Sequence, residues 1–189
     1  EGGKTYRSGL VGVALSGDIS VDTIVAQGCR PVGEPMMVTK SEGSIVQRLG
    51  DATPMEILKE LFNGADKHDK WLIRRGLHVG IVVDRFTTSF SGGDFLIRNV
   101  IGLDQVTGGI KVSDVAQEGQ IVQFHLRDAA TARADLAAAL QQYVDVRLGQ
   151  RPEAALLFSN IGRGHHLYRE ADHDTNLFRE IIAPVPLTG

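Results

Sequence analysis

The chain has 189 residues and a formal net charge of −3 at pH 7, with 42% hydrophobic and 23% charged residues. These are ordinary values for a globular protein of one domain or two tightly packed halves, and they exclude a disordered chain. The small negative charge gives no electrostatic reason to expect nucleic acid as a partner. A single cysteine excludes an internal disulfide and fits a reducing, cytoplasmic setting. No apolar run reaches the roughly 20 residues of a membrane span, and no signal-peptide pattern is present.

Strands joined by short turns are predicted for the first part of the chain. Leu10–Ser16 and Ile19–Gln27 are apolar, β-branched runs on either side of Gly17-Asp18, a pattern that favours a hairpin. Met36–Thr39 and Ser44–Leu49 predict two further strands. Because the first residue is Glu1, we expect a fragment of a longer protein.

Capping residues predict where several helices begin and end. Thr53-Pro54-Met55-Glu56 combines an N-cap, a proline at the first helical position and the glutamate of a capping box. A short helix is predicted over Lys67–Arg75, ending at Gly76 as a left-handed cap. The longest helix follows Asp128 and covers about Ala129–Leu148, and the last covers Asp174–Ile182. The buried face predicted for the longest helix consists of Ala132, Leu136, Leu140, Tyr143 and Val144.

Further strands are predicted over Leu77–Asp84, Phe95–Ile101, Gly109–Ser113, Ile121–Arg127 and Ala154–Phe158. The Ser/Thr/Gly segment 87–93 is expected to be a mobile or ligand-facing loop. Hairpin signals with helices gathered in a few places favour an α+β fold over alternating α/β. We expect mainly antiparallel sheet of about eight to nine strands, with three to four helices.

Polar residues interrupt several of these strands. Alternation places Gln123, His125 and Arg127 on one face of the Ile121–Arg127 strand. That face is either the solvated side of an antiparallel sheet or a recognition surface, since amide, imidazole and guanidinium groups all bind ligands well. Asp128, which precedes the helical run, is expected to cap the helix.

Three other short segments of the sequence place arginine among apolar residues or glycines. Arg98 and Asn99 lie in the 92–99 string, Arg30 follows Cys29, and Arg163 lies between two glycines. A half-buried guanidinium needs an anion or several acceptors, because burying an unpaired charge is costly. Each arginine is therefore either a structural ion-pair partner or a clamp for a small anionic ligand.

Two chemical alternatives depend on single residues. Cys29 beside Arg30, with His125 as base, suggests a nucleophile, although a lone cysteine is more often a small buried filler. The histidines at 165, 166 and 173 lack the helical spacing of a metal site, which argues against structural zinc.

The polar segments described above, taken in order, resemble the C-terminal domain of the FIST family, from about Gly12 to Gly189. The residues that carry the resemblance are 15–18 (LSGD), 27–33 (QGCRPVG), 93–99 (GDFLIRN), 122–128 (VQFHLRD) and 162–164 (GRG). On this basis residues 1–189 are expected to form one FIST C-like domain. In place of the cysteine that many relatives carry before Gly-Arg-Gly, this chain has Asn160. The family's N-terminal half and a Gly-Glu-Ile-Gly-Pro segment are expected to be missing, which would leave a site shared between halves incomplete.

The resemblance implies a non-catalytic sensory domain for a small ligand such as an amino acid, with an N-terminal FIST half and a signalling protein as partners. It also implies two alternatives, namely a protein-recruiting adaptor with an exposed apolar patch, as in F-box relatives, and a haem-based nitric-oxide sensor. Haem would need an axial ligand such as His125. The sequence does not name a cofactor. We expect the ligand-binding residues to be Arg30, Arg98, Asn99, Gln123, His125, Arg127 and Arg163, with Arg98, Arg163 and the polar face of the Ile121–Arg127 strand in one pocket.

Overall fold

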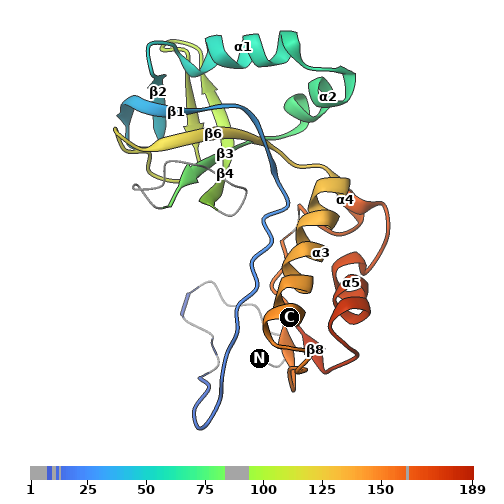
Figure 1. Cartoon of the computed structure of the whole chain (residues 1–189). Coiled ribbons are helices and arrows are strands. Elements are labelled where there is room, and N and C mark those ends of the chain that lie inside the picture. Colours follow the sequence, from blue (N-terminus) through green and yellow to red (C-terminus); the bar gives the residue numbers. More distant parts are fainter. Residues whose placement is uncertain (1–7, 10–11, 13, 84–93, 161) are drawn as a thin grey trace.

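A computed structural model of the chain describes residues 8–9, 12, 14–83, 94–160 and 162–189. The described part divides into a β-barrel with two helices beside it and a helical part with a two-stranded sheet (Figure 1). The predicted loop at 87–93 lies outside the described residues. In chain order the elements are β1 (Arg30–Glu42), β2 (Ile45–Leu49), α1 (Pro54–Gly64), α2 (Lys67–Arg75), β3 (Leu77–Val82), β4 (Phe95–Asp104), β5 (Gly109–Val112), β6 (Ile121–Leu126), α3 (Ala129–Val146), β7 (Ala155–Leu156), α4 (His165–Tyr168), α5 (His173–Ile181) and β8 (Leu187–Thr188).

The barrel contains six described strands in the order β1-β2-β5-β4-β3-β6, with every neighbouring pair antiparallel. The barrel closes because β1 is long enough to pair with two strands, β6 along its first half and β2 along its second. Register shifts in β1 fall near Met36 and Lys40, where bulges let the strand bend from one partner to the other.

The barrel interior is aliphatic and aromatic. Period-two alternation sends Val122, Phe124 and Leu126 of β6 inward, where they meet Val79 and Ile81 of β3 in one buried cluster. The other face of β6 carries Gln123 and His125, so the polar face read from the sequence is the outer face of the barrel wall.

The two helices beside the barrel begin as the sequence predicts. Thr53 and Glu56 form both halves of the capping box of α1. The side chain of Asp66 caps α2 by accepting from the backbone N–H of Asp69. Gly76 ends α2, but with a φ of 171° and so in extended conformation, and the left-handed cap predicted there is wrong.

A second core lies in the helical part. Leu136 and Leu140 of α3 pack against Leu177 and Phe178 of α5 and against Ile182. The Asp128 side chain caps α3 by accepting from the backbone N–H of Thr131 at 2.8 Å, as predicted. The parallel pair β7–β8 stands apart from the barrel strands.

The fold class, α+β with mainly antiparallel strands, is confirmed, but the details of the prediction need correction. The antiparallel sheet has six strands, fewer than expected. The described residues form five helices, because α4, which follows the glycine loop, was not predicted. The predicted hairpin of Leu10–Ser16 and Ile19–Gln27 is wrong in its described part, where residues 14–27 form no strand. No helix in the described ranges is long and apolar enough to cross a membrane.

Candidate functional site: a cationic groove between barrel and helices

A groove of about 1140 Å³ lies where the barrel meets the helical part. One wall comes from the end of α2 and the adjoining strands β3 and β4, and the opposite wall comes from the glycine loop and α4. The junction of β6 with α3 supplies Arg127 and Asp128 between the two walls. The groove therefore joins segments far apart in the sequence, including three of the residues predicted as ligand-binding, Arg98, Asn99 and Arg127.

Arg127 is a half-buried cation of this groove. Its Nε donates to the Cys29 sulfur at 3.3 Å, and one terminal nitrogen donates to the Gln27 carbonyl oxygen at 3.4 Å. Another terminal nitrogen lies about 3.2 Å from where a Cβ on Gly162 would stand, so the glycine loop passes directly over the guanidinium. Within the described residues Arg127 forms no ion pair with a carboxylate, in contrast to the other arginines predicted for the site.

Two histidines lie on the strands beside this cation. His78 on β3 lines the groove and lies directly across from His125 on β6, and each buries a ring nitrogen without a hydrogen-bond partner. Burial and the nearby Arg127 charge lower the pKa of His78 to about 4, and burial lowers the pKa of His125 as well. Both rings are therefore uncharged at neutral pH, and neither balances nor adds to the charge of Arg127.

Arg98 and Asn99 bring β4 to the groove. Arg98 is paired with Asp114 at 2.6 Å, whereas Asn99 is exposed and stands next to His78 in the β3–β4 ladder. The groove's second carboxylate, Asp128, is engaged too, by Arg30 and by the N-terminus of α3. Both acids of the groove thus have partners, while Arg75, Arg127 and Arg169 form no ion pair among the described side chains.

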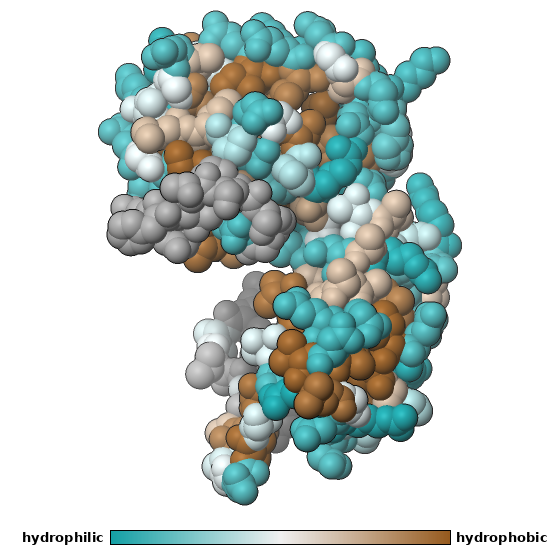
Figure 2. Space-filling view, in the orientation of Figure 1, coloured by the Kyte–Doolittle hydropathy of each residue, from teal (hydrophilic) through white to brown (hydrophobic). Residues whose placement is uncertain are grey.

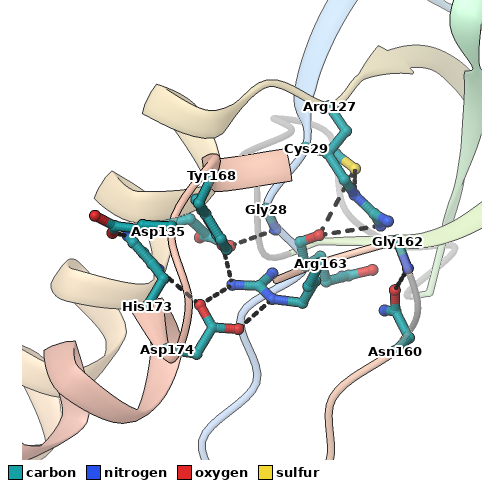
Figure 3. A network of polar contacts seen from close by, with 12 residues as sticks. Gly28, Cys29, Arg127, Asp135, Asn160, Gly162, Arg163, Tyr168, His173 and Asp174 are labelled. Atoms are coloured by element: carbon teal, nitrogen blue, oxygen red, sulfur yellow. Dashed lines mark hydrogen bonds and ion pairs between the residues drawn. The ribbon is translucent and has the colours of Figure 1, made fainter. Parts of the chain in front are cut away.

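Arg163 lies behind the groove in a buried network (Figure 3). Its guanidinium makes two bonds to Asp174, at 2.6 and 3.1 Å, and donates to the Tyr168 hydroxyl at 2.7 Å. His173 stacks on Tyr168 and bonds to the same carboxylate. With side-chain exposures of 7% and 11%, the Arg163–Asp174 pair is satisfied internally and holds the glycine loop against α5.

The remaining candidate residues also have internal roles. Arg30 pairs with Asp69 of α2 and Asp128 at the start of α3, which ties both helices to the first residue of β1. Gln123 donates to the Gly33 carbonyl oxygen at 2.6 Å, and His125 is fully buried with its Nδ1 3.0 Å from the Gln123 carbonyl oxygen. None of these three lines the groove.

The thiol of Cys29 is not activated by this arrangement. Burial raises the pKa of the Cys29 thiol, although the Arg127 charge opposes the rise, and the His125 ring is bonded to the strand backbone. The nucleophile–base pair considered from the sequence is therefore not assembled. Across the described ranges, no group of three or more His, Cys, Asp or Glu side chains is placed to hold a metal ion.

Several residues in and near the groove were not among the candidates predicted from the sequence. His78, Arg75 and Arg169 line the groove, and no role in a binding site was predicted for them from the sequence. Asp135 on α3, which accepts from the backbone N–H of Gly28 at 2.7 Å, gave no signal either. Gly28 has a φ of 66°, and a Cβ there would come within 2.9 Å of both Ala132 and Arg163, which explains the glycine beside Cys29.

A closed antiparallel barrel, a helical layer and a groove between them that is lined by several arginines define an α+β protein. The chain belongs to the FIST family: the FIST C domain model matches residues 54–189, and the FIST N domain model matches residues 1–52. Both domains thus occur in this chain, so the expectation that the N-terminal half is missing is wrong. Residues 12–52, which the sequence analysis assigned to the C-terminal domain, fall in the FIST N match. FIST domains are known as sensory domains of signalling proteins.

The chain is similar to mycobacterial proteins over nearly all of its length. It is 41% identical over 182 residues to "Uncharacterized protein Rv0628c" of Mycobacterium tuberculosis and 40% identical to "Uncharacterized protein Mb0898c" of Mycobacterium bovis. Each alignment covers 96% of this chain and 47% of the relative, so the chain spans about half the length of the curated relatives it matches. No solved structure matches it significantly.

Proposed function

We propose that the chain is a sensory domain that binds a small anionic or amino-acid-like ligand in the groove between barrel and helices. The observation that carries this proposal is Arg127, a half-buried guanidinium with no carboxylate partner among the described residues. Burying an uncompensated charge is costly, so an anionic ligand would stabilise the site by supplying the missing charge.

The surroundings of Arg127 suit a carboxylate-bearing molecule. Arg75 and Arg169 add positive charge to the same groove, and the neutral ring of His78 and the exposed amide of Asn99 offer further polar contacts. A volume of about 1140 Å³ exceeds that of one amino acid, so the groove can admit a larger ligand of the same chemistry. Arg30 and Arg163 would support the site by fixing β1, α2 and the glycine loop instead of touching the ligand.

The signalling role rests on the family. A role in the cytoplasm beside a signalling partner accords with the match to both FIST domains, of which the N-terminal one is residues 1–52 of this chain. Haem ligation by His125 has less support, because that ring is fully buried and does not line the groove.

Titration calorimetry with L-amino acids and small dicarboxylates such as succinate and L-malate tests the proposal. For a ligand that binds, Arg127→Ala should weaken the affinity about tenfold or more, because a charged hydrogen bond contributes roughly 1.5–3 kcal/mol. Arg127→Lys should fall in between, since a lysine keeps the charge but loses the planar fork.

The matched control is Arg151→Ala, because Arg151 is exposed and far from the groove lining. Its affinity should equal that of the wild type, and circular dichroism should show all three variants folded. A ligand that binds Arg127→Ala as tightly as the wild type would place the site elsewhere.

A further inference from the structure

A second groove, of about 530 Å³, lies on the other side of the end of α2. Its helical wall is one face of α1, with Met55, Leu58 and Phe62 at positions i, i+3 and i+7, and its opposite wall is β4. In Figure 2 apolar surface is visible below α1 in this region. Four residues, Arg75, Gly76, Leu77 and Val100, line both this groove and the cationic groove described above.

The strand wall exposes large aliphatic side chains. Ile101 is 57% and Leu103 is 53% exposed, whereas their neighbours Val100 and Gly102 are partly buried. Isolated exposed aliphatics are common on monomers, but here they face an apolar helix surface across a groove. Apolar surface of this kind marks a place where another molecule binds and covers it.

The rim of the groove is positively charged. Lys59, Arg74 and Arg75 line it, and no acidic residue does. None of these cations forms an ion pair within the described part of the chain. Instead Arg74 lies over the Phe62 ring at 4.9 Å and Arg75 over the Trp71 ring at 4.6 Å, which positions the guanidinium groups and leaves their charge uncompensated.

This local charge contrasts with the chain as a whole, whose net charge is −3. Arginine, methionine and aromatic side chains together are also the composition enriched at protein interfaces. An occupant must therefore combine apolar side chains for the floor with acidic groups for the rim. A bilayer does not fit, because a concave groove between a helix and a strand keeps its floor away from a flat surface.

We propose that this groove docks an amphipathic helix of a partner protein, with apolar residues at i, i+3 or i+4 and i+7 flanked by Asp and Glu. Such a helix would lie along α1, place its apolar side chains against Phe62 and Leu103, and set its carboxylates beside Lys59 and Arg74. The groove would thus be a second interaction surface, which shares one wall with the site of the small ligand.

The probe is a synthetic peptide of about four turns with leucines on one helical face and glutamates on both flanks, and ¹⁵N–¹H NMR spectra of the full chain report binding even at millimolar affinity. We expect shifts confined to α1, the end of α2 and β4, and weaker binding at high salt. Arg74→Glu and Leu103→Ser should each weaken the affinity several-fold to tenfold, the first through charge and the second through apolar contact.

Arg151→Glu, on a surface distant from the groove, should bind the peptide like the wild type and is the matched control for charge reversal. A peptide with lysines in place of the glutamates should not bind. The proposal is overturned if no peptide binds at millimolar concentration, if the lysine peptide binds equally, or if Arg74-dependent binding is found only for phosphatidylglycerol vesicles.

Discussion

His78 is a buried imidazole that lies beside a guanidinium and directly across the ladder from another buried imidazole, His125. Burial, the Arg127 charge and the His125 ring all oppose protonation of His78, and together they lower its pKa from 6.5 to about 4. In the unfolded chain nothing opposes protonation, so the imidazole titrates at its ordinary pKa. The folded state therefore binds fewer protons than the unfolded state between these two pH values.

The free energy of unfolding should consequently fall as the pH is lowered from about 6.5 to about 4. The stabilisation from the neutral ring is fully present above the pKa of the imidazole in the unfolded state. It is lost as the pH falls through the pKa of the imidazole in the folded state. Its full size is roughly 3 kcal/mol, at 1.36 kcal/mol for each pKa unit. Urea unfolding across this pH range measures the slope.

His78→Gln is the comparison variant, because glutamine does not titrate in this range. Its slope between pH 6.5 and 4 should be shallower than that of the wild type, with the remainder due to His125, whose pKa is also lowered. The carboxyl groups with a lowered pKa, among them Asp114, Asp128 and Asp174, begin to lose their stabilisation below about pH 5, and they do so equally in wild type and His78→Gln. An unchanged slope in His78→Gln would contradict the assignment.

The arginines show how far residue-level prediction reaches. Sequence alone identified half-buried guanidinium groups that need partners, and Arg30, Arg98 and Arg163 each have a carboxylate. It could not tell which arginine lacks one, because the carboxylates come from other elements; the partners of Arg30, Asp69 and Asp128, lie 39 and 98 residues away. Only the folded chain separates the structural arginines from Arg127.

At the scale of elements, the side chain of Gln27 acts as a short strand partner. Its amide oxygen accepts from the Ile97 backbone N–H at 2.8 Å, and its amide nitrogen donates to the Phe95 carbonyl oxygen. These groups lie at the start of β4, ahead of the stretch from Val100 onward that pairs with β5. One glutamine therefore continues the ladder where the neighbouring strand is absent.

Gln27→Ala should expose this part of β4. We expect amide hydrogen exchange at Ile97 to accelerate and the free energy of unfolding to fall by about 1–3 kcal/mol, because the N–H loses its acceptor. Gln142→Ala is the matched control, since Gln142 is exposed on α3. Equal exchange rates at Ile97 in wild type and Gln27→Ala would show that the bond does not protect β4.

Most elements could be predicted from local pattern, because caps and apolar periodicity are properties of short segments. The capping box of α1 and the Asp128 cap of α3 are examples. The segment around Ile19–Gln27 shows the limit of this reasoning. Its β-branched residues favour extended backbone, but a strand also needs a neighbour for its ladder, and in residues 14–27 no strand forms. Local composition cannot say whether a neighbour is present.

At the scale of the molecule, the chain has two cores, one inside the barrel around Phe124 and one between α3 and α5 around Leu140. The α+β class followed from the order of strands and helices, whereas barrel closure did not. Closure depends on β1 changing partners near Met36, and nothing in the local pattern of β1 specifies two partners. The predicted pocket is only partly realised: Arg98 and Arg127 line the groove between the cores, but Arg163 does not, because the course of the groove depends on how the two cores pack.

The wall that the two grooves share, Arg75–Leu77 with Val100, would contact both of the proposed ligands, and measurement decides whether it couples them. The four dissociation constants of a carboxylate and a helical peptide, each measured with and without the other, form a closed thermodynamic cycle. Whatever factor the carboxylate applies to the peptide affinity, the peptide must apply to the carboxylate affinity. A factor between about 5 and 150 would make α2 a transmitting element. A factor of one would mean that the two grooves bind their ligands independently. Signalling would then have to depend on another surface of the chain.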